Sequence, residues 1–213
     1  MQIYRRLFGA YGAQNWWPGD TPFEVMVGAV LTQNTAWTNV ERAIGNLKSE
    51  NLMDANRIHS IRQAWLARLI RPAGYFNVKA RRLKNLCAWL VRRGGMAWAR
   101  RQPTEKLRAE LLSINGVGPE TADAILLYAF HRPVFVIDAY TRRLCRALGV
   151  IRGDEPYESL RAAFESVLEP DPRIYNEYHA LIVRHAKERC SGEPRCRHCK
   201  VERPLFTPHR RPL

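Results

Sequence analysis

The sequence predicts an all-α protein, and three observations support this fold class. Apolar residues recur at helical spacing through most of the 213 residues, no segment shows a convincing alternation typical of strands, and proline or a capping residue precedes several apolar stripes. The composition, with 25 % charged and 46 % hydrophobic residues, is ordinary for a folded chain. A chain of this length buries a core without disulfide staples, so we expect one domain or two closely packed ones.

Proline and polar residues mark where several of the expected helices begin. The first begins at Pro22 and runs through Leu31, with Glu24 in the first turn, where exposed backbone N–H groups favour an acid. Thr104 is a candidate N-cap for a later helix, and Pro119 begins the next one. The apolar run 134–137 follows a proline and is expected to be an extended link. The other helices are expected from apolar stripes alone, over residues 39–47, 61–70, 83–91, 138–148, 157–167 and 175–188.

The charge balance predicts a polyanionic partner. Lys and Arg number 34 against 20 Asp and Glu, which gives a formal net charge of +14. Nucleic acid is the first expectation and an anionic membrane surface the second. Residues 181–213 hold nine basic residues against three Glu, and residues 78–101 hold no acid. Both segments are candidate phosphate-facing surfaces, with a solvated basic face as the alternative; the basic residues of the second are Lys79, Arg81, Arg82, Lys84, Arg92, Arg93, Arg100 and Arg101.

No apolar run reaches the length of a membrane span, and no signal-peptide core follows the N-terminus. We therefore expect a cytoplasmic protein, associated with the nucleoid if the partner is DNA. Three of five cysteines crowd into Cys190, Cys196 and Cys199, which in a reducing compartment favours a metal site over disulfides. Cys87 and Cys145 fall in apolar helical stripes and are expected in the core.

The densest group of chemically informative residues lies between positions 111 and 146. Two expected helices are joined by a tight turn that contains Gly116-Val117-Gly118, and glycines there allow the backbone to turn sharply and approach a ligand. The N–H groups of such a turn and of the helix that follows can hold a phosphate. About twenty residues later, Asp138 places a carboxylate at a helix start.

Together these residues resemble the helix-hairpin-helix DNA glycosylase superfamily, to which endonuclease III belongs. The resemblance rests on Gly116-Val117-Gly118, Thr121-Ala122 and Asp138 followed by Arg142 or Arg143, and it extends to residues 22–24, 31–35, 74–80 and 185–190. It implies an all-α fold in which a cleft separates a six-helix domain, residues 21–133, from a domain formed by residues 1–20 plus 134–213 with the Cys-rich loop. It also implies a monomer that bends double-stranded DNA and flips out a damaged base.

One position departs from the pattern of the bifunctional relatives. They carry a lysine two residues after the second hairpin glycine, whereas this chain has Glu120, and a carboxylate cannot form a Schiff base. The resemblance therefore implies a monofunctional DNA glycosylase of base excision repair, an N-glycosylase without lyase activity, in which water attacks with the help of Asp138. Glu120 is placed at the base pocket, with a plain helix acid as its alternative reading.

Residues 15–18, 28–35 and 120–126 resemble those of 3-methyladenine DNA glycosylase III and of bacterial and archaeal endonuclease III-related proteins, and this resemblance implies a base pocket like that of the glycosylase. The resemblance implies that Trp16, Trp17 and Trp37 line it and that Lys187 lies nearby. Aromatic faces attract the positive charge of an alkylated purine. Core packing is the alternative for the paired tryptophans, although Pro18 suggests a loop.

Further DNA contacts are implied by position. The resemblance assigns Gln33 to fill the gap left by the flipped base and Tyr75 to wedge into the opposite strand, besides Gly116, Val117, Gly118 and Thr121 of the hairpin. The alternatives are a polar residue at a helix end for Gln33 and a packing role for Tyr75.

The cysteine cluster resembles the beginning of a [4Fe–4S] loop but lacks one ligand. A cluster of this type takes four thiolates, and Leu205 stands where the fourth is expected. A fourth ligand from His198 or His209, zinc in place of iron, and a site without metal stay open. Alternative functions are excision of uracil or thymine from mismatches, excision of adenine opposite oxidised guanine, and DNA binding without catalysis.

Overall fold

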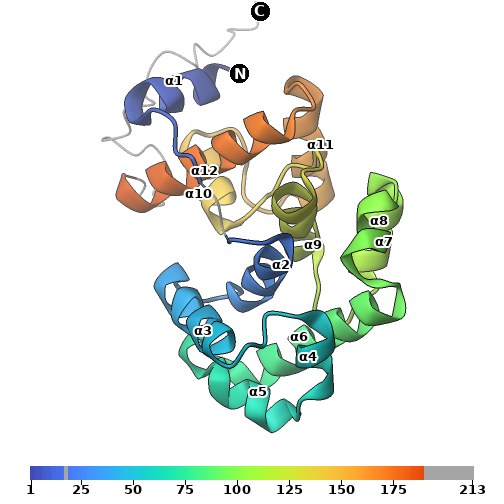
Figure 1. Ribbon diagram of the computed structural model, residues 1–213. Coiled ribbons are helices and arrows are strands. Elements are labelled where there is room, and N and C mark those ends of the chain that lie inside the picture. The colour runs from blue at the N-terminus through green and yellow to red at the C-terminus, as the bar shows by residue number, and fades with distance from the viewer. Residues whose placement is uncertain (17–18, 190–213) are drawn as a thin grey trace, which may run out of the picture. The chain divides into compact units, whose positions relative to one another are not determined.

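The computed structural model describes residues 1–16 and 19–189 of the 213. Over these residues the chain forms helices joined by turns and extended links, and none of them belongs to a strand (Figure 1). The predicted all-α fold class is confirmed. The structure divides into two compact units, one formed by Met1–Trp16 with Ile137–Leu213 and one by Trp17–Val136. Among the described residues, no helix is long and apolar enough to cross a bilayer.

The continuous unit, Trp17–Val136, is built around one buried helix. Helix α2 packs against α3, α6, α9 and η2, and most of its side chains are buried. The unit contains α2 (Pro22–Leu31), α3 (Trp37–Ser49), α4 (Ala55–Ser60), α5 (Gln63–Leu69), η1 (Arg71–Ala73), α6 (Phe76–Arg92), α7 (Gly95–Arg101), α8 (Thr104–Leu112), α9 (Pro119–Ala124) and the π-helical turn η2 (Ile125–Ala129).

The start of α2 shows why this helix forms where the sequence predicts it. The Thr21 hydroxyl accepts a hydrogen bond from the Glu24 backbone N–H at 3.1 Å, and Pro22 occupies the first turn, where its missing N–H costs nothing. The Glu24 carboxylate in turn pairs with Lys48 of α3 at 2.8 Å. The cap and this ion pair fix the N-terminal end of the central helix.

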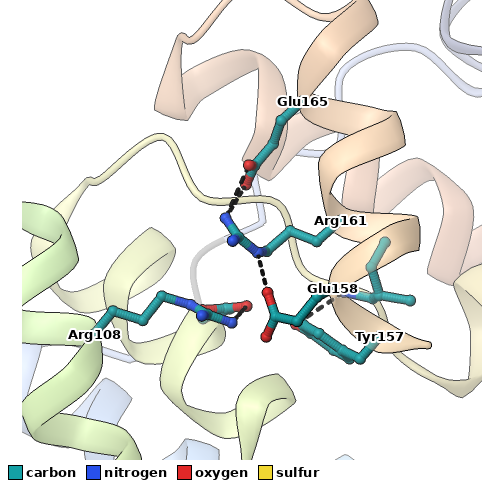
Figure 2. A network of polar contacts seen from close by, with 7 residues as sticks. Arg108, Tyr157, Glu158, Arg161 and Glu165 are labelled. Atoms are coloured by element: carbon teal, nitrogen blue, oxygen red, sulfur yellow. Dashed lines mark hydrogen bonds and ion pairs between the residues drawn. The ribbon is translucent and has the colours of Figure 1, made fainter.

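The unit that combines both ends of the chain has a simpler plan. Its helices are α1 (Gln2–Tyr11), α10 (Ala139–Ala147), α11 (Tyr157–Val167) and α12 (Pro172–Glu188). Helix α12 packs against both α1 and α10, so residues from the beginning of the chain meet residues from its last described helix. The Tyr11 hydroxyl lies 2.9 Å from Nδ1 of the buried His185. On α11, Arg161 pairs with Glu158 at 3.0 Å and with Glu165 at 2.9 Å (Figure 2).

A buried ion pair joins the two helices of the hairpin. Arg108 of α8 donates through Nε to Asp123 Oδ1 at 2.6 Å and through Nη2 to Oδ2 at 3.1 Å; Figure 2 shows the arginine side chain extending from its helix. The side chains of Arg108 and Asp123 are 9 % and 0 % exposed. Two parallel charge-assisted bonds of this kind fix the angle between α8 and α9.

Some element boundaries differ from the sequence predictions. Pro103 is the N-cap of α8, so Thr104 is the first helical residue and does not cap. Residues 134–137 form the extended link that was expected, and α11 has the predicted bounds. Cys87 and Cys145 are buried, as expected. The apolar stripes did not predict α1, α4 and α7.

Candidate functional site

Asp138 is held at the beginning of α10 by its own helix. It is the N-cap residue, with extended backbone, and its Oδ1 accepts a hydrogen bond from the Thr141 backbone N–H at 2.7 Å. Only 13 % of its side chain is exposed. A carboxylate in this place satisfies an otherwise unpaired N–H and lies at the positive end of the helix dipole. Sequence and structure therefore agree on a fixed carboxylate at a helix start.

The second oxygen of Asp138 faces a histidine. His179 of α12 has its Nε2 3.4 Å from Asp138 Oδ2, and its side chain is 5 % exposed. Burial pushes the pKa of Asp138 upward, but the facing imidazole of His179 and the Thr141 N–H outweigh burial, so the pKa lies below its ordinary value. The group is thus ionised at neutral pH. It can stabilise a developing positive charge or accept a proton from water.

Trp16 lies on the same histidine. Its ring stacks on the imidazole of His179 with centroids 5.9 Å apart and an interplanar angle of 22°. The chain reaches this position after α1 through Asn15, whose φ of 49° turns the backbone, and the Gln14 N–H donates to Glu177 of α12 at 2.6 Å. Trp16 is half-buried and outside any helix, as expected of a loop. Trp17, its predicted partner, is outside the described residues.

Lys187 and Tyr140 form a separate contact on the same unit. The Lys187 ammonium lies 5.4 Å from the centroid of the Tyr140 ring, and the Arg143 guanidinium lies 5.0 Å from it. Lys187 is exposed in the last turn of α12, about 12 Å along the helix from His179. The structure thus places Lys187 beside an aromatic ring that follows Asp138 by two residues.

In the continuous unit, the hairpin turn requires glycine at one position. Gly116 has a φ of 98°, and a Cβ added there would collide with Cγ of the Arg82 side chain. Gly118 adopts an extended backbone with open space around it, so the freedom of glycine is not needed there. Val117 is buried, whereas Gly118 and Glu120 are exposed at the first turn of α9. The turn therefore presents the beginning of α9 to solvent.

Gln33 is bound to this hairpin. Its amide Nε2 donates to the Gly116 carbonyl at 3.2 Å and to the Thr121 hydroxyl at 2.9 Å, and its Oε1 accepts a hydrogen bond from Arg82 of α6. Three segments that are far apart in the sequence thus meet at one amide side chain. Gln33, Gly116 and Thr121, all predicted to contact DNA, lie together.

Tyr75 projects from a strained turn. It follows Gly74, which has a φ of 67°, and has itself a φ of 45°, a region that aromatic residues rarely adopt. Its side chain is 72 % exposed although it is large and apolar. Strain of this kind persists only where the surroundings impose it, and it is frequent at functional sites. The geometry suits a side chain that inserts into a partner.

A buried lysine joins the bases of both loops. The Lys79 ammonium donates to the Leu31 carbonyl at 2.8 Å and to the Ala73 carbonyl at 2.7 Å. Leu31 ends α2 just before the Gln33 loop, and Ala73 ends η1 just before Tyr75. Burial, and then the charge of Arg82, lower the pKa of Lys79 to about 8, so the ammonium keeps its proton at neutral pH.

The prediction that Lys79 lies on a phosphate-facing surface is wrong, because its side chain is buried. Other cations of residues 78–101 also have structural contacts. Arg82 binds Gln33, Lys84 donates to the His59 carbonyl at 2.7 Å, and Arg93 pairs with Glu110 at 2.6 Å. Four further arginines of this segment are exposed to solvent, namely Arg81, Arg92, Arg100 and Arg101.

Trp37 lies in the continuous unit. It is the first residue of α3, and its ring lies over Gly28 of α2, where an added Cβ would be 3.4 Å from the ring atom Cη2. Glycine at position 28 leaves room for the half-buried indole. Cys190, Cys196 and Cys199, the predicted metal ligands, are outside the described residues, as are His198 and Leu205. Residues 1–16 and 19–189 contain no group of three or more side chains placed to hold a metal ion.

Comparison with known proteins decides the family. Residues 27–170 match the HhH-GPD superfamily of base excision DNA repair proteins. The chain belongs to this superfamily. A candidate DNA repair glycosylase of Methanocaldococcus jannaschii is 51 % identical over 205 residues, which cover 94 % of this chain and 93 % of the relative. The resemblance to endonuclease III and its relatives is thereby confirmed.

Solved structures of HhH-GPD proteins have the same fold. The H. pylori 3-methyladenine DNA glycosylase, solved bound to 1,N6-ethenoadenine, is 30 % identical and superimposes with a TM-score of 0.77 over 88 % of this chain and 96 % of its own. An endonuclease III in a non-covalent complex with DNA also gives a TM-score of 0.77, at 22 % identity, over 93 % of this chain and 89 % of its own. At 22 % identity, the likeness to this endonuclease III is evidence for a shared fold alone.

Sequence reasoning did not predict His179. Its signal is weak but present, because His179 falls in the apolar stripe of α12 together with Tyr175, Tyr178, Ile182 and Ala186. A polar residue on a buried helical face needs a partner. The sequence could not name that partner, and His185 on the same helix gives the same signal.

Proposed function

We propose that this protein is a monofunctional DNA glycosylase that removes a damaged base, an alkylated purine, from double-stranded DNA. The observation that carries the proposal is the ionised, nearly buried carboxylate of Asp138, fixed at a helix N-terminus by Thr141 and His179. A buried charge is costly and is a frequent sign of a catalytic site. Membership of the HhH-GPD superfamily supports this reading.

The reaction requires the protein to place a negative charge and a water molecule beside the sugar. The bond between the base and C1′ of the sugar breaks, and positive charge develops on the sugar. The Asp138 carboxylate stabilises that charge and accepts a proton from the attacking water. The electron pair of the broken bond stays with the base, so a positively charged alkylated purine leaves as a neutral molecule without taking up a proton. The oxygen of water joins C1′, the proton of that water passes from Asp138 to solvent, and an abasic site remains. Gln33 and Tyr75 hold the DNA open while this happens.

The base class is supported by aromatic residues and by one relative. Trp16 stacks on His179, and His179 faces Asp138, so one imidazole links the indole to the carboxylate. Aromatic faces attract a positively charged alkylated purine. The H. pylori relative is a 3-methyladenine DNA glycosylase. The test is a panel of duplexes, each with one lesion: 3-methyladenine, ethenoadenine, a uracil or thymine mismatch, or adenine opposite oxidised guanine. Release of uracil, thymine or mismatched adenine but of no alkylated purine would contradict the proposed base class.

Wild-type protein is expected to leave the DNA strand intact. Glu120 offers no amine where bifunctional relatives have one, so borohydride added during turnover should trap no covalent complex, and strands should break only after alkali or heat. In Glu120→Lys, an amine enters the exposed first turn of α9, where the helix N-terminus favours its neutral form. We expect detectable trapping on DNA with a preformed abasic site, measured by gel electrophoresis.

Glu120→Gln is the matched control, because it removes the same charge without adding an amine. Efficient trapping by the wild type or by Glu120→Gln would show that another amine attacks the sugar. Absence of trapping by a folded, DNA-binding Glu120→Lys would show that this side chain does not face the sugar.

DNA affinity is expected to depend strongly on salt, because the formal net charge is +14. If a bound monomer neutralises about five phosphates, log affinity falls against log salt with a slope of about −4 to −5. Fluorescence anisotropy with an undamaged duplex at several salt concentrations measures this slope. A slope near zero would contradict DNA binding through phosphates.

A further inference from the structure

We propose that His179 is the positioning residue for Asp138: it binds and orients the catalytic carboxylate, with its ring held in place by Trp16. This inference rests on the proposed function, because it assigns His179 a role through the carboxylate that function requires. It adds a residue of α12, which no sequence motif marked, to a site otherwise built from α10 and the N-terminal segment.

The two oxygens of Asp138 have different partners in different helices. Oδ1 is bound by the Thr141 N–H within α10, and Oδ2 faces His179 Nε2 from α12. One contact alone would leave the carboxylate free to rotate about its terminal bond, which is a soft torsion. Contacts on both oxygens fix its plane. The distance of 3.4 Å is typical of catalytic groups before substrate binding, which tightens such contacts.

The chemistry of the pair assigns the proton. An ionised carboxylate only accepts hydrogen bonds, so Nε2 of His179 must carry the hydrogen that points at Oδ2. Because His179 donates to the ionised form, it favours that form against burial, in agreement with the lowered pKa of Asp138. The histidine thus keeps a nearly buried acid ionised.

The ring of His179 is itself held in place by a residue outside its own helix. Trp16 stacks on it at 22°, and Trp16 is anchored because the neighbouring Gln14 N–H is bound by Glu177, two residues before His179 on α12. Stacking fixes the ring plane and therefore the direction of Nε2. A residue expected to line the base pocket is thereby linked to the catalytic carboxylate through one imidazole.

Other titratable groups on the neighbouring helices have partners of their own. These contacts are Arg142 with the Glu155 carbonyl, Arg143 with the Tyr140 ring, His185 with Tyr11, and Glu177 with the Gln14 N–H. His179 is accordingly the group whose replacement tests the ionisation of Asp138.

Two variants separate the parts of this role. His179→Phe keeps a ring for Trp16 but removes the donor, whereas His179→Gln keeps an N–H donor but removes the ring. We expect base release in single turnover, with enzyme in excess, to fall about 10- to 150-fold in His179→Phe, the factor for a hydrogen bond to a charged group. His179→Gln should lose less. DNA affinity should change less than about threefold in both.

The pH dependence supplies a readout that a packing role would not change. Without the donor of the histidine, burial raises the pKa of Asp138, so the acid limb of the rate profile moves to higher pH in His179→Phe and by less in His179→Gln. The carbon-13 shift of the Asp138 carboxyl, titrated by NMR, reports the same pKa without any catalysis. In an Asp138→Asn background, His179→Phe should lower the rate no further.

The outcomes keep the two hypotheses apart. If the wild type releases bases but the carboxyl pKa and the rate of His179→Phe match the wild type, His179 is not a positioning residue. If the wild type releases no base although the carboxyl pKa rises in His179→Phe, the proposed function is wrong and the pair stands. If His179→Phe does not fold, His179→Leu, which also removes the donor, takes its place, since an unshifted pKa with a wild-type rate there overturns the inference.

Discussion

Replacement of Asp138 by asparagine is expected to lower the rate of base release by about 1,000-fold or more. Asparagine keeps the shape of the side chain and caps helices as well as aspartate does, so α10 should remain intact. What disappears is the negative charge that stabilises the sugar cation and accepts the proton of water. Lesion-DNA affinity should stay the same or rise, because the loss concerns the transition state. Single-turnover base release and anisotropy measure the two effects.

Asp171→Asn is the matched control for this experiment. Asp171 is also an N-cap aspartate, at the beginning of α12, where it accepts a hydrogen bond from the Arg173 N–H at 2.8 Å. The same chemical change there removes a charge from a cap outside the site, so base release should stay within about twofold of wild type. If Asp138→Asn releases bases as fast as Asp171→Asn, the carboxylate of Asp138 is not catalytic.

Replacement of Asp123 by alanine is expected to lower the free energy of unfolding by about 3–5 kcal/mol. The change leaves Arg108, 9 % exposed, as a buried charge without its carboxylate partner on α9. Urea denaturation followed by circular dichroism measures the loss, provided that the transition stays two-state.

Two further variants test the cause of that loss. Arg108→Met combined with Asp123→Leu removes both charges and should recover most of the stability, since a buried pair replaced by apolar side chains is often nearly neutral. Glu188→Ala breaks the exposed pair with Arg184, where both side chains are over 40 % exposed, and should cost less than about 0.5 kcal/mol. Equal losses for Asp123→Ala and Glu188→Ala would show that burial does not decide the effect.

Sequence periodicity predicted helices whose signals are local. The stripe of α11 and the proline that begins α9 were sufficient to place those elements. Helix α1 depends instead on docking against α12, far along the chain. Helix α7 begins at paired glycines, Gly94 and Gly95, whose φ values of 94° and 77° belong to a turn. These glycines favour a turn at the residues where α7 begins, so the sequence pattern did not indicate a helix there.

The site divides in the same way. Asp138 and the hairpin were predictable because each is a short contiguous pattern. The burial of Lys79 was not, since the carbonyl of Leu31 that its ammonium binds lies 48 residues away. His179 meets Asp138 only after α10 and α12 pack together. Pairings across such separations leave no local pattern, because each partner alone has an ordinary reading.

The hydrogen bonds of the Gln33 amide restrict which substitutions this sequence can accept during evolution. The Gln33 amide forms hydrogen bonds with Arg82, Gly116 and Thr121. A substitution at any of these four positions therefore changes which residues fit at the other three. A descendant that gained a side chain at position 116 would collide with the stem of Arg82 and would need a smaller residue at position 82 as well. These four positions are therefore expected to be inherited as a set, although 88 residues separate the first from the last.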